Sequence, residues 1–366
     1  LHRRVAERLE HGFSADLDAV AADLGSQFER AGDSALAVPY FERAAQVAQR
    51  RFADREAVAA FTHALALLAE LPAGNERDFQ EVSLRAAMGH SLAAAEGERS
   101  AALGLSSARL RTLCDAVGES PGEVLALFSI LTHELGEGQV SVANVTAARI
   151  LELSEHVAPM FLGLGHLTAG ITRCYAGDFV GARHHFEERV REGSAGDWPA
   201  AADPMLICLS HLAELTLIPL GEVTGALDHL RGCLAWAEHL RHPYARVLAW
   251  NAAANTHALL RDPGAALEFC DQVQRACAQY DVPSFAHRGA LIQAAMRAVR
   301  GEGAASPEML AEWLAVYEKT GLIGKSVGFL AAVQTAAAGG RVEEAFGYVH
   351  DALRFVQTSG ERMREA

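Results

Sequence analysis

Residues 160–192, MFLGLGHLTAGITRCYAGDFVGARHHFEERVRE, decide the fold of this chain. The apolar stretch that ends at Tyr175 predicts one helix, and the amphipathic stretch from Phe179 onward predicts a second. Gly177 and Asp178 lie between them, where a glycine and a helix-capping carboxylate are typical of a tight turn. The stretch therefore predicts a helical hairpin.

The same unit returns further along the chain. When Ala182 on the second helix is taken as an anchor, the corresponding residues are Ala226, Ala266 and Ala345. Their successive spacings are 44, 40 and 79 residues, and the last equals about two periods of 40. Paired helices at a period of roughly 34–47 residues are typical of helical solenoids, in which each hairpin packs on its neighbours.

An alanine followed four positions later by a large residue marks the second helices. The full pattern occurs in Ala37/Phe41, Ala57/Phe61 and Ala182/Phe186. The alanine is kept and the phenylalanine is replaced by a smaller residue in Ala226/Leu230, Ala266/Cys270 and Ala345/Val349. The small residue lets two helices approach closely, and the large one fills the gap to the next hairpin. We therefore expect an all-α fold, a right-handed α-solenoid of tetratricopeptide-like helical hairpins.

Composition limits the classes of function. The chain has 366 residues and a net charge of −14, and its short basic clusters are offset by nearby acids, so we expect no direct binding of nucleic acid. No apolar run is long enough to cross a membrane, and we expect no membrane partner. Six cysteines occur at irregular spacings without a Cys-x-x-Cys, which favours reduced thiols in a cytoplasmic protein and no metal site.

Four segments follow from the spacing of the predicted helices. Residues 1–75 are expected to form N-terminal helical repeats, and residues 76–158 irregular helical pairs. Residues 159–358 are expected to form regular hairpins with a period of about 40 residues. Residues 359–366 form a charged tail, expected to be a polar end cap or the start of a further segment.

The first 75 residues carry the most specific pattern. The stretches LHRRVAERLE, ADLGSQFERAGD and PYFERAAQVAQRRFADREAVAAFTHALALLAELP resemble the start of the tetratricopeptide region in large bacterial signalling ATPases. Those proteins carry a nucleotide-binding module and often a cyclase, kinase or DNA-binding head, and the maltose-regulon activator has a related layout. The resemblance implies a sensor or partner-docking arm that regulates an attached ATPase, and no catalysis in this segment.

Two local motifs invite a chemical interpretation that their context does not support. Gly324-Lys325-Ser326 ends like a phosphate-binding loop, but that loop needs a glycine at position 319, which is Lys319, and a preceding strand. We expect a loop before a helix, with Ser326 near its cap. His184 and His185 are adjacent and face about 100° apart on a helix, so we expect a solvated face and no shared metal ion.

Candidate binding residues follow from solenoid geometry, because the first helix of each hairpin lines the concave surface. Positions fifteen and eleven residues before each anchor alanine are four apart and share one face. The polar side chains at these positions are His211, Asn251, Asn255 and Gln334. Asn251 and Asn255 form a pair of amides able to hold a peptide backbone or a sugar hydroxyl.

The sequence thus predicts a non-catalytic interaction or sensor solenoid without a cofactor. Its partner would be another protein, or an ATPase or effector module of the same protein. An alternative is a sensor that binds a small molecule such as an oligosaccharide in the concave groove. Self-association through an uncapped end of the array also stays open.

Overall fold

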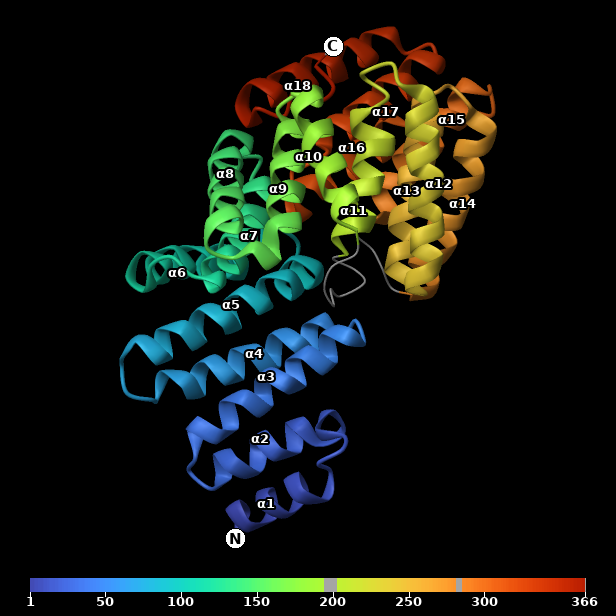
Figure 1. Cartoon of the computed structure of the whole chain (residues 1–366). Helices are drawn as coiled ribbons and strands as arrows, with labels where there is room; N and C mark the ends of the chain where they lie inside the picture. The colour runs from blue at the N-terminus through green and yellow to red at the C-terminus, as the bar shows by residue number, and fades with distance from the viewer. Residues whose placement is uncertain (194–202, 281–284, 366) are drawn as a thin grey trace. The chain divides into compact units, whose positions relative to one another are not determined.

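The chain is an all-α helical-repeat protein. The structure, a computed structural model, describes residues 1–193, 203–280 and 285–365. Over these residues it consists of helices and connecting turns without a strand, which confirms the expected fold class (Figure 1). None of the helices in the described ranges is long and apolar enough to cross a membrane.

Two compact units divide the chain, Leu1–His133 and Glu134–Ala366, and the division falls in the last turn of α7. It lies inside the range 76–158 that the sequence groups as irregular pairs. The helices of unit 1 are α1 (His2–Gly12), η1 (Leu17–Val20), α2 (Ala21–Arg30), α3 (Ser34–Arg50), α4 (Asp54–Ala69), α5 (Asn75–Glu96), α6 (Ala101–Val117) and most of α7 (Pro121–Gly136).

Unit 2 contains the regular hairpins. Its helices up to the middle of the unit are α8 (Val140–His156), η2 (Pro159–Phe161), α9 (Leu162–Tyr175), α10 (Phe179–Glu192), α11 (Pro204–His211), the π-helical η4 (Leu212–Thr216) and α12 (Val223–Leu240). Those that follow are α13 (Pro243–Leu259), α14 (Pro263–Tyr280), α15 (Ala286–Val299), α16 (Pro307–Thr320), α17 (Lys325–Ala338) and α18 (Val342–Ser359). Sequence neighbours such as α9 and α10, or α17 and α18, pack as hairpins.

The anchor alanines hold these hairpins together. Ala182, Ala226 and Ala266 are fully buried and Ala345 is 7% exposed, which confirms that they are wedged between helices. The larger residue four positions later is also buried in five of the six pairs. Val349 is the exception at 38% exposure, because it lies on α18, after which no further hairpin follows in the described chain.

The predicted Gly-Asp turn forms as expected. Gly177 has a φ of 84°, a left-handed conformation that favours glycine. The next residue, Asp178, accepts a hydrogen bond from the backbone N–H of Gly181 at 2.9 Å and so caps α10. Gly32 and Asp33 repeat the arrangement before α3.

The prediction for the two adjacent histidines is half right. His184 is solvent-exposed, but His185 is only 6% exposed and its Nδ1 lies 3.0 Å from Nδ1 of His166 on α9. The reason is the 100° turn between adjacent helical positions, which directs one ring outward and the other into the hairpin. Burial lowers the pKa of His185 to about 4.

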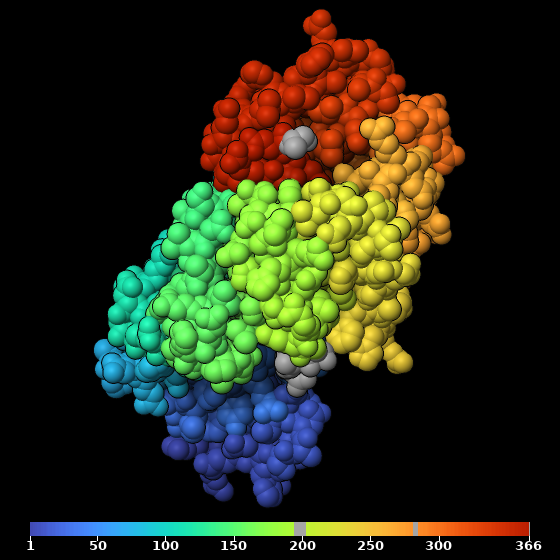
Figure 2. Space-filling view, turned by 45° about the horizontal axis from the view of Figure 1, so that its top comes forward, coloured from blue at the N-terminus to red at the C-terminus, as the bar shows by residue number. Residues whose placement is uncertain are grey.

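Unit 2 closes on itself. The backbone N–H of Leu322, before α17, donates to the carbonyl of Gly136 at 2.8 Å. The backbone N–H of Arg362, after α18, donates to the carbonyl of Tyr175 at 2.7 Å. Figure 2 shows the red surface of the last helix and the segment after it against the green surface of the first helices of unit 2. The first and last hairpins of this unit are therefore in contact.

Candidate functional site

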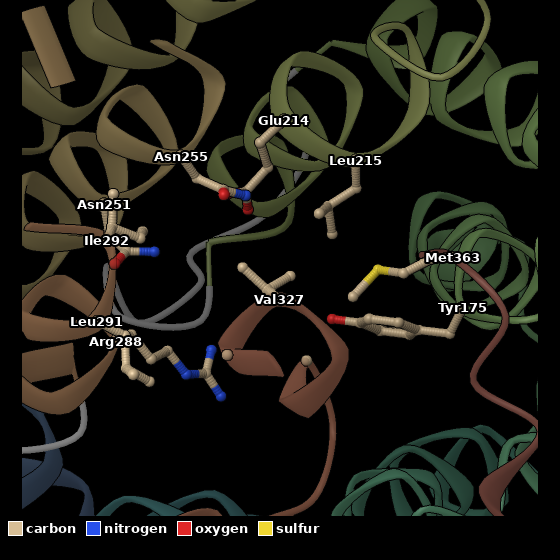
Figure 3. Close-up of a pocket in the computed structure, with 12 residues that line it drawn as sticks. Tyr175, Glu214, Leu215, Asn251, Asn255, Arg288, Leu291, Ile292, Val327 and Met363 are labelled. Atoms are coloured by element: carbon tan, nitrogen blue, oxygen red, sulfur yellow. The ribbon is translucent and has the colours of Figure 1, made fainter. Parts of the chain in front are cut away.

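A polar pocket of unit 2 lies where six different parts of the chain meet. Its lining comes from the end of α9, the π-helix η4, α13, α15, the start of α17 and the segment after α18. Figure 3 shows the polar side chains that converge on it, among them Asn251, Asn255, Glu214 and Arg288. The cavity measures about 50 Å³, which is room for a few water molecules at roughly 10–15 Å³ each.

Asn255 and Glu214 form the best-defined contact in this pocket. Nδ2 of Asn255 on α13 donates to Oε2 of Glu214 at 3.1 Å. Glu214 lies on a π-helix, whose extra residue per turn changes the direction of the side chains that follow. Burial raises the pKa of the Glu214 carboxyl, and the hydrogen bond from Asn255 opposes that shift. The amide thus stabilises a carboxylate in a poorly hydrated place.

Asn251 lies one turn earlier on the same face of α13. Its side chain is only 9% exposed, and its Oδ1 has no hydrogen-bond partner within the described residues. A buried amide oxygen without a partner costs roughly 1–3 kcal/mol, so such a group is rare unless a water or a ligand satisfies it. Asn251 is therefore a polar group positioned to bind something that enters the pocket.

Arg288 brings a positive charge to the pocket from α15. Its guanidinium lies 5.6 Å from the ring centroid of Tyr317 and 5.9 Å from that of Phe285. Nη2 donates to the carbonyl of Ile323 at 3.4 Å. Cation–π contact with two rings orients the planar guanidinium, which suits it to recognise an anionic group.

The residues after α18 fill the rest of this region. Glu361 is fully buried, and its carboxylate accepts hydrogen bonds from the backbone N–H groups of Gly324 at 2.9 Å and Ser326 at 3.2 Å. Met363 is 4% exposed and lines the pocket. The guanidinium of Arg364 donates to the backbone carbonyl of Glu214 at 3.3 Å. The segment expected as a polar tail thus places an acid, a thioether and a base inside unit 2.

Burial also decides how these groups ionise. Burial raises the pKa of Glu361, although the hydrogen bonds from Ser326 and Gly324 favour its charged form. It lowers the pKa of Arg364 and raises that of Tyr175 well above its usual value. Charged groups held in this way are expensive to bury, because each loses hydration that its partners only partly replace.

The four residues predicted to face the groove divide into two groups. Asn251 and Asn255 both line the polar pocket described above. Gln334 lines a smaller cavity of about 10 Å³ beside it, together with Asn255. His211 lines neither of these two cavities: its Nδ1 lies 2.8 Å from the carbonyl of Ile207, and its ring packs on Tyr175 and Phe186. Burial lowers the pKa of His211 to about 4.

Sequence reasoning missed the charged residues in and beside the pocket. Glu214, Arg288 and Glu361 do not occupy the positions that the repeat marks as concave. A signal for one of them was present in Gly324-Lys325-Ser326, which lacks a phosphate loop but still offers two backbone N–H groups to a carboxylate. No group of three or more His, Cys, Asp or Glu side chains in the described ranges could hold a metal ion.

Comparison with known proteins supports the fold alone. No protein-family model matches the chain, and no curated protein does. Among solved structures, the chain is similar to a Rap protein complexed with competence and sporulation factor, with a TM-score of 0.60 and 12% sequence identity. The match covers 90% of this chain and 92% of that one. It agrees with a tetratricopeptide-like helical-repeat fold over both units.

Proposed function

We propose that this chain is a non-catalytic regulatory and protein-interaction region that acts on a bacterial signalling ATPase, either attached to it or bound to it. The observation that carries the proposal is the polar pocket of unit 2, which already holds a segment of polypeptide by backbone and side-chain contacts. We infer that the partner is an ATPase because residues 1–75 resemble the tetratricopeptide region of bacterial signalling ATPases.

The Rap protein of similar fold was solved in complex with competence and sporulation factor. We propose that this chain binds its partner through the inner surface of its repeats. Similarity of fold does not establish function, so this proposal needs support from the site itself. That support comes from Asn251, whose buried oxygen has no hydrogen-bond partner in the described part of the chain, and from Arg288, whose guanidinium points towards the pocket.

The test is nucleotide hydrolysis by the gene product or partner that carries the ATPase module. We expect removal of residues 160–358 to change the rate by roughly 5- to 150-fold, the usual range of coupling between two sites. The double variant Asn251→Ala, Asn255→Ala is expected to reproduce most of that change without removing the fold. An unchanged rate and unchanged partner binding after the deletion would reject the proposal.

A second candidate is a small-molecule sensor, for example of an oligosaccharide, and the Asn251 and Asn255 amides favour it. The present cavity of about 50 Å³ is far below the roughly 300–1,000 Å³ of ordinary ligand pockets, so the ligand would have to displace residues 360–365. A thermal-shift screen tests this, since a ligand at about 100 times its Kd stabilises the native state by about 2.7 kcal/mol. A compound that stabilises the Asn251→Ala, Asn255→Ala variant as much as the wild type would bind at another site.

A further inference from the structure

The segment Gly360–Glu365 contacts unit 2 in the way that a bound peptide contacts its receptor. It leaves the end of α18 and runs without helical structure over the ends of α9 and α17. Its exposed residue Arg362 gives only a backbone N–H to the carbonyl of Tyr175, while the side chains on either side of it are buried. Backbone contacts combined with pockets for alternate side chains are a common mode of peptide recognition.

Glu361 provides the strongest of these contacts. Two backbone N–H groups at the start of α17 point at its carboxylate, and the positive end of the helix dipole favours a negative charge there. Gly324 has a φ of 77°, which turns its N–H towards the incoming oxygen. This arrangement recognises a carboxylate without regard to which chain supplies it.

Two further positions of the segment are recognised separately. Met363 enters the apolar part of the pocket, beside the ring of Tyr175 (Figure 3). Arg364 reaches the backbone carbonyl of Glu214 and lies near the Glu214 carboxylate, whose charge attracts it. The pattern that unit 2 binds is therefore an acid, any residue, an apolar residue and a base.

The site is incompletely satisfied when this segment occupies it. A cavity of about 50 Å³ is left beside Met363, and the buried Oδ1 of Asn251 has no hydrogen-bond partner among the residues that the structure describes. A segment that served only to complete the core would be expected to fill its cavity and to satisfy the polar groups around it. A longer or better-matched peptide could use both features.

We propose that the surface of unit 2 that residues 360–365 contact is a binding site for a partner's peptide segment of the pattern Glu-x-Met-Arg, and that residues 360–365 are its built-in, displaceable occupant. The partner is the signalling ATPase of the proposed function. Only this identity of the partner rests on the proposed function. When the partner binds, its peptide segment displaces residues 360–365 from this site. A tethered occupant competes at an effective concentration in the millimolar range, so it raises the threshold for the partner.

The test uses the full chain and a fluorescein-labelled peptide with the sequence of residues 359–365, SGERMRE. Three proteins are compared by fluorescence anisotropy: the wild type, the variant Glu361→Ala, Met363→Ala, and the matched control Glu343→Ala, Gln357→Ala, whose two changed side chains are exposed and lie outside the segment. We expect the first variant to bind the peptide at least about ten-fold more tightly than the wild type or the control, because its own segment no longer competes.

Two further measurements locate the bound peptide. A peptide with Gln in place of the residue that corresponds to Glu361 is expected to bind the variant roughly ten-fold more weakly, because a charged acceptor becomes neutral. Hydrogen exchange of the Gly324 and Ser326 amides is expected to be fast in the variant and slow again when SGERMRE is added. The ATPase is absent from these measurements, so their failure is distinguishable from failure of the proposed function.

Three outcomes would overturn the inference. The folded variant could fail to bind the peptide, or all three proteins could bind it equally. Loss of helical circular dichroism in the variant would show instead that the segment is a fixed part of the core.

Discussion

The side-chain amide of Asn255 donates to the carboxylate of Glu214 at 3.1 Å, 41 residues earlier in the chain. The contact joins α13 to the π-helix of the preceding hairpin, and both residues line the same pocket. Asn251 lies one turn away on the same helix, yet its oxygen makes no such contact. Two amides of equal chemistry therefore have different energetic roles, and this difference can be measured.

Replacing each asparagine by leucine separates these roles. We expect Asn255→Leu to lower the free energy of unfolding by about 1–3 kcal/mol, because it removes the donor to a partly buried carboxylate. Asn251→Leu removes an oxygen that is already unsatisfied and is expected to be neutral or stabilising. Urea denaturation of the two variants at pH 7 tests the contrast, and an equal loss in both would contradict it.

Two glycines provide a second matched pair. A Cβ at Gly170 on α9 would lie 2.6 Å from the ring of Phe186, so Gly170→Ala is expected to destabilise unit 2 by about 1–3 kcal/mol through overpacking. A Cβ added at Gly347 on α18 would have no atom within 4 Å. Gly347→Ala is expected to stabilise by about 0.5–1 kcal/mol through helix propensity. Thermal unfolding should show a lower melting temperature for Gly170→Ala and a higher one for Gly347→Ala. A stabilising Gly170→Ala would show that the hairpin is more loosely packed.

Acid is expected to destabilise unit 2 through His287. This residue is 7% exposed, neither of its ring nitrogens has a hydrogen-bond partner in the described residues, and burial lowers its pKa to about 3. The unfolded chain takes up the proton near the usual histidine pKa of 6.5, so the stability is present above pH 6.5 and is lost as the pH falls towards 3. At pH 5 the loss amounts to about 2 kcal/mol.

The variant His287→Leu checks that sign. Urea denaturation at pH 8 and pH 5 should show a smaller difference between the two pH values for the variant than for the wild type. The same difference in both proteins would mean that His287 is protonated in the folded state.

In unit 1, Glu81 accepts hydrogen bonds from Arg109 at 2.7 and 2.9 Å and from Arg85 at 2.7 Å. The hydrogen bond from Arg109 is the main reason that the pKa of Glu81 falls to about 2. The resulting stability is present above the usual carboxyl pKa and is lost as the pH falls towards 2. We expect Glu81→Gln to cost about 1–2 kcal/mol at pH 7, after allowance for solvent screening. Urea denaturation should show a smaller loss of stability in Glu81→Gln at pH 3 than at pH 7. A loss that is equal at both pH values would mean that the charge of Glu81 does not contribute.

The sequence predicts the hairpins well because their packing repeats. Ala182 and Phe186 recur in register with their counterparts, and a fixed spacing is visible without coordinates. Asn251 and Asn255 were found for the same reason, since they lie four residues apart on an inner helix. Their role as ligand-binding residues stays a prediction.

The rest of the pocket depends on irregularities that a repeat does not encode. The π-helix η4 adds a residue to its turn, which directs Glu214 to the pocket and leaves the neighbouring His211 packed on Tyr175. Glu361 lies in a charged stretch that reads as solvated, and only the tertiary fold brings it to the amides of Gly324 and Ser326.

The hydrogen bond between Leu322 and Gly136 has a consequence for how unit 2 comes apart. An open array of repeats frays from its two ends, one hairpin at a time, since each end has a single neighbour. In unit 2, this bond and residues 360–365 join the last hairpin to the first. Every hairpin of the unit therefore has a neighbour on both sides. Releasing residues 360–365 would remove one of these two closing contacts and leave the bond between Leu322 and Gly136 to join the first and last hairpins.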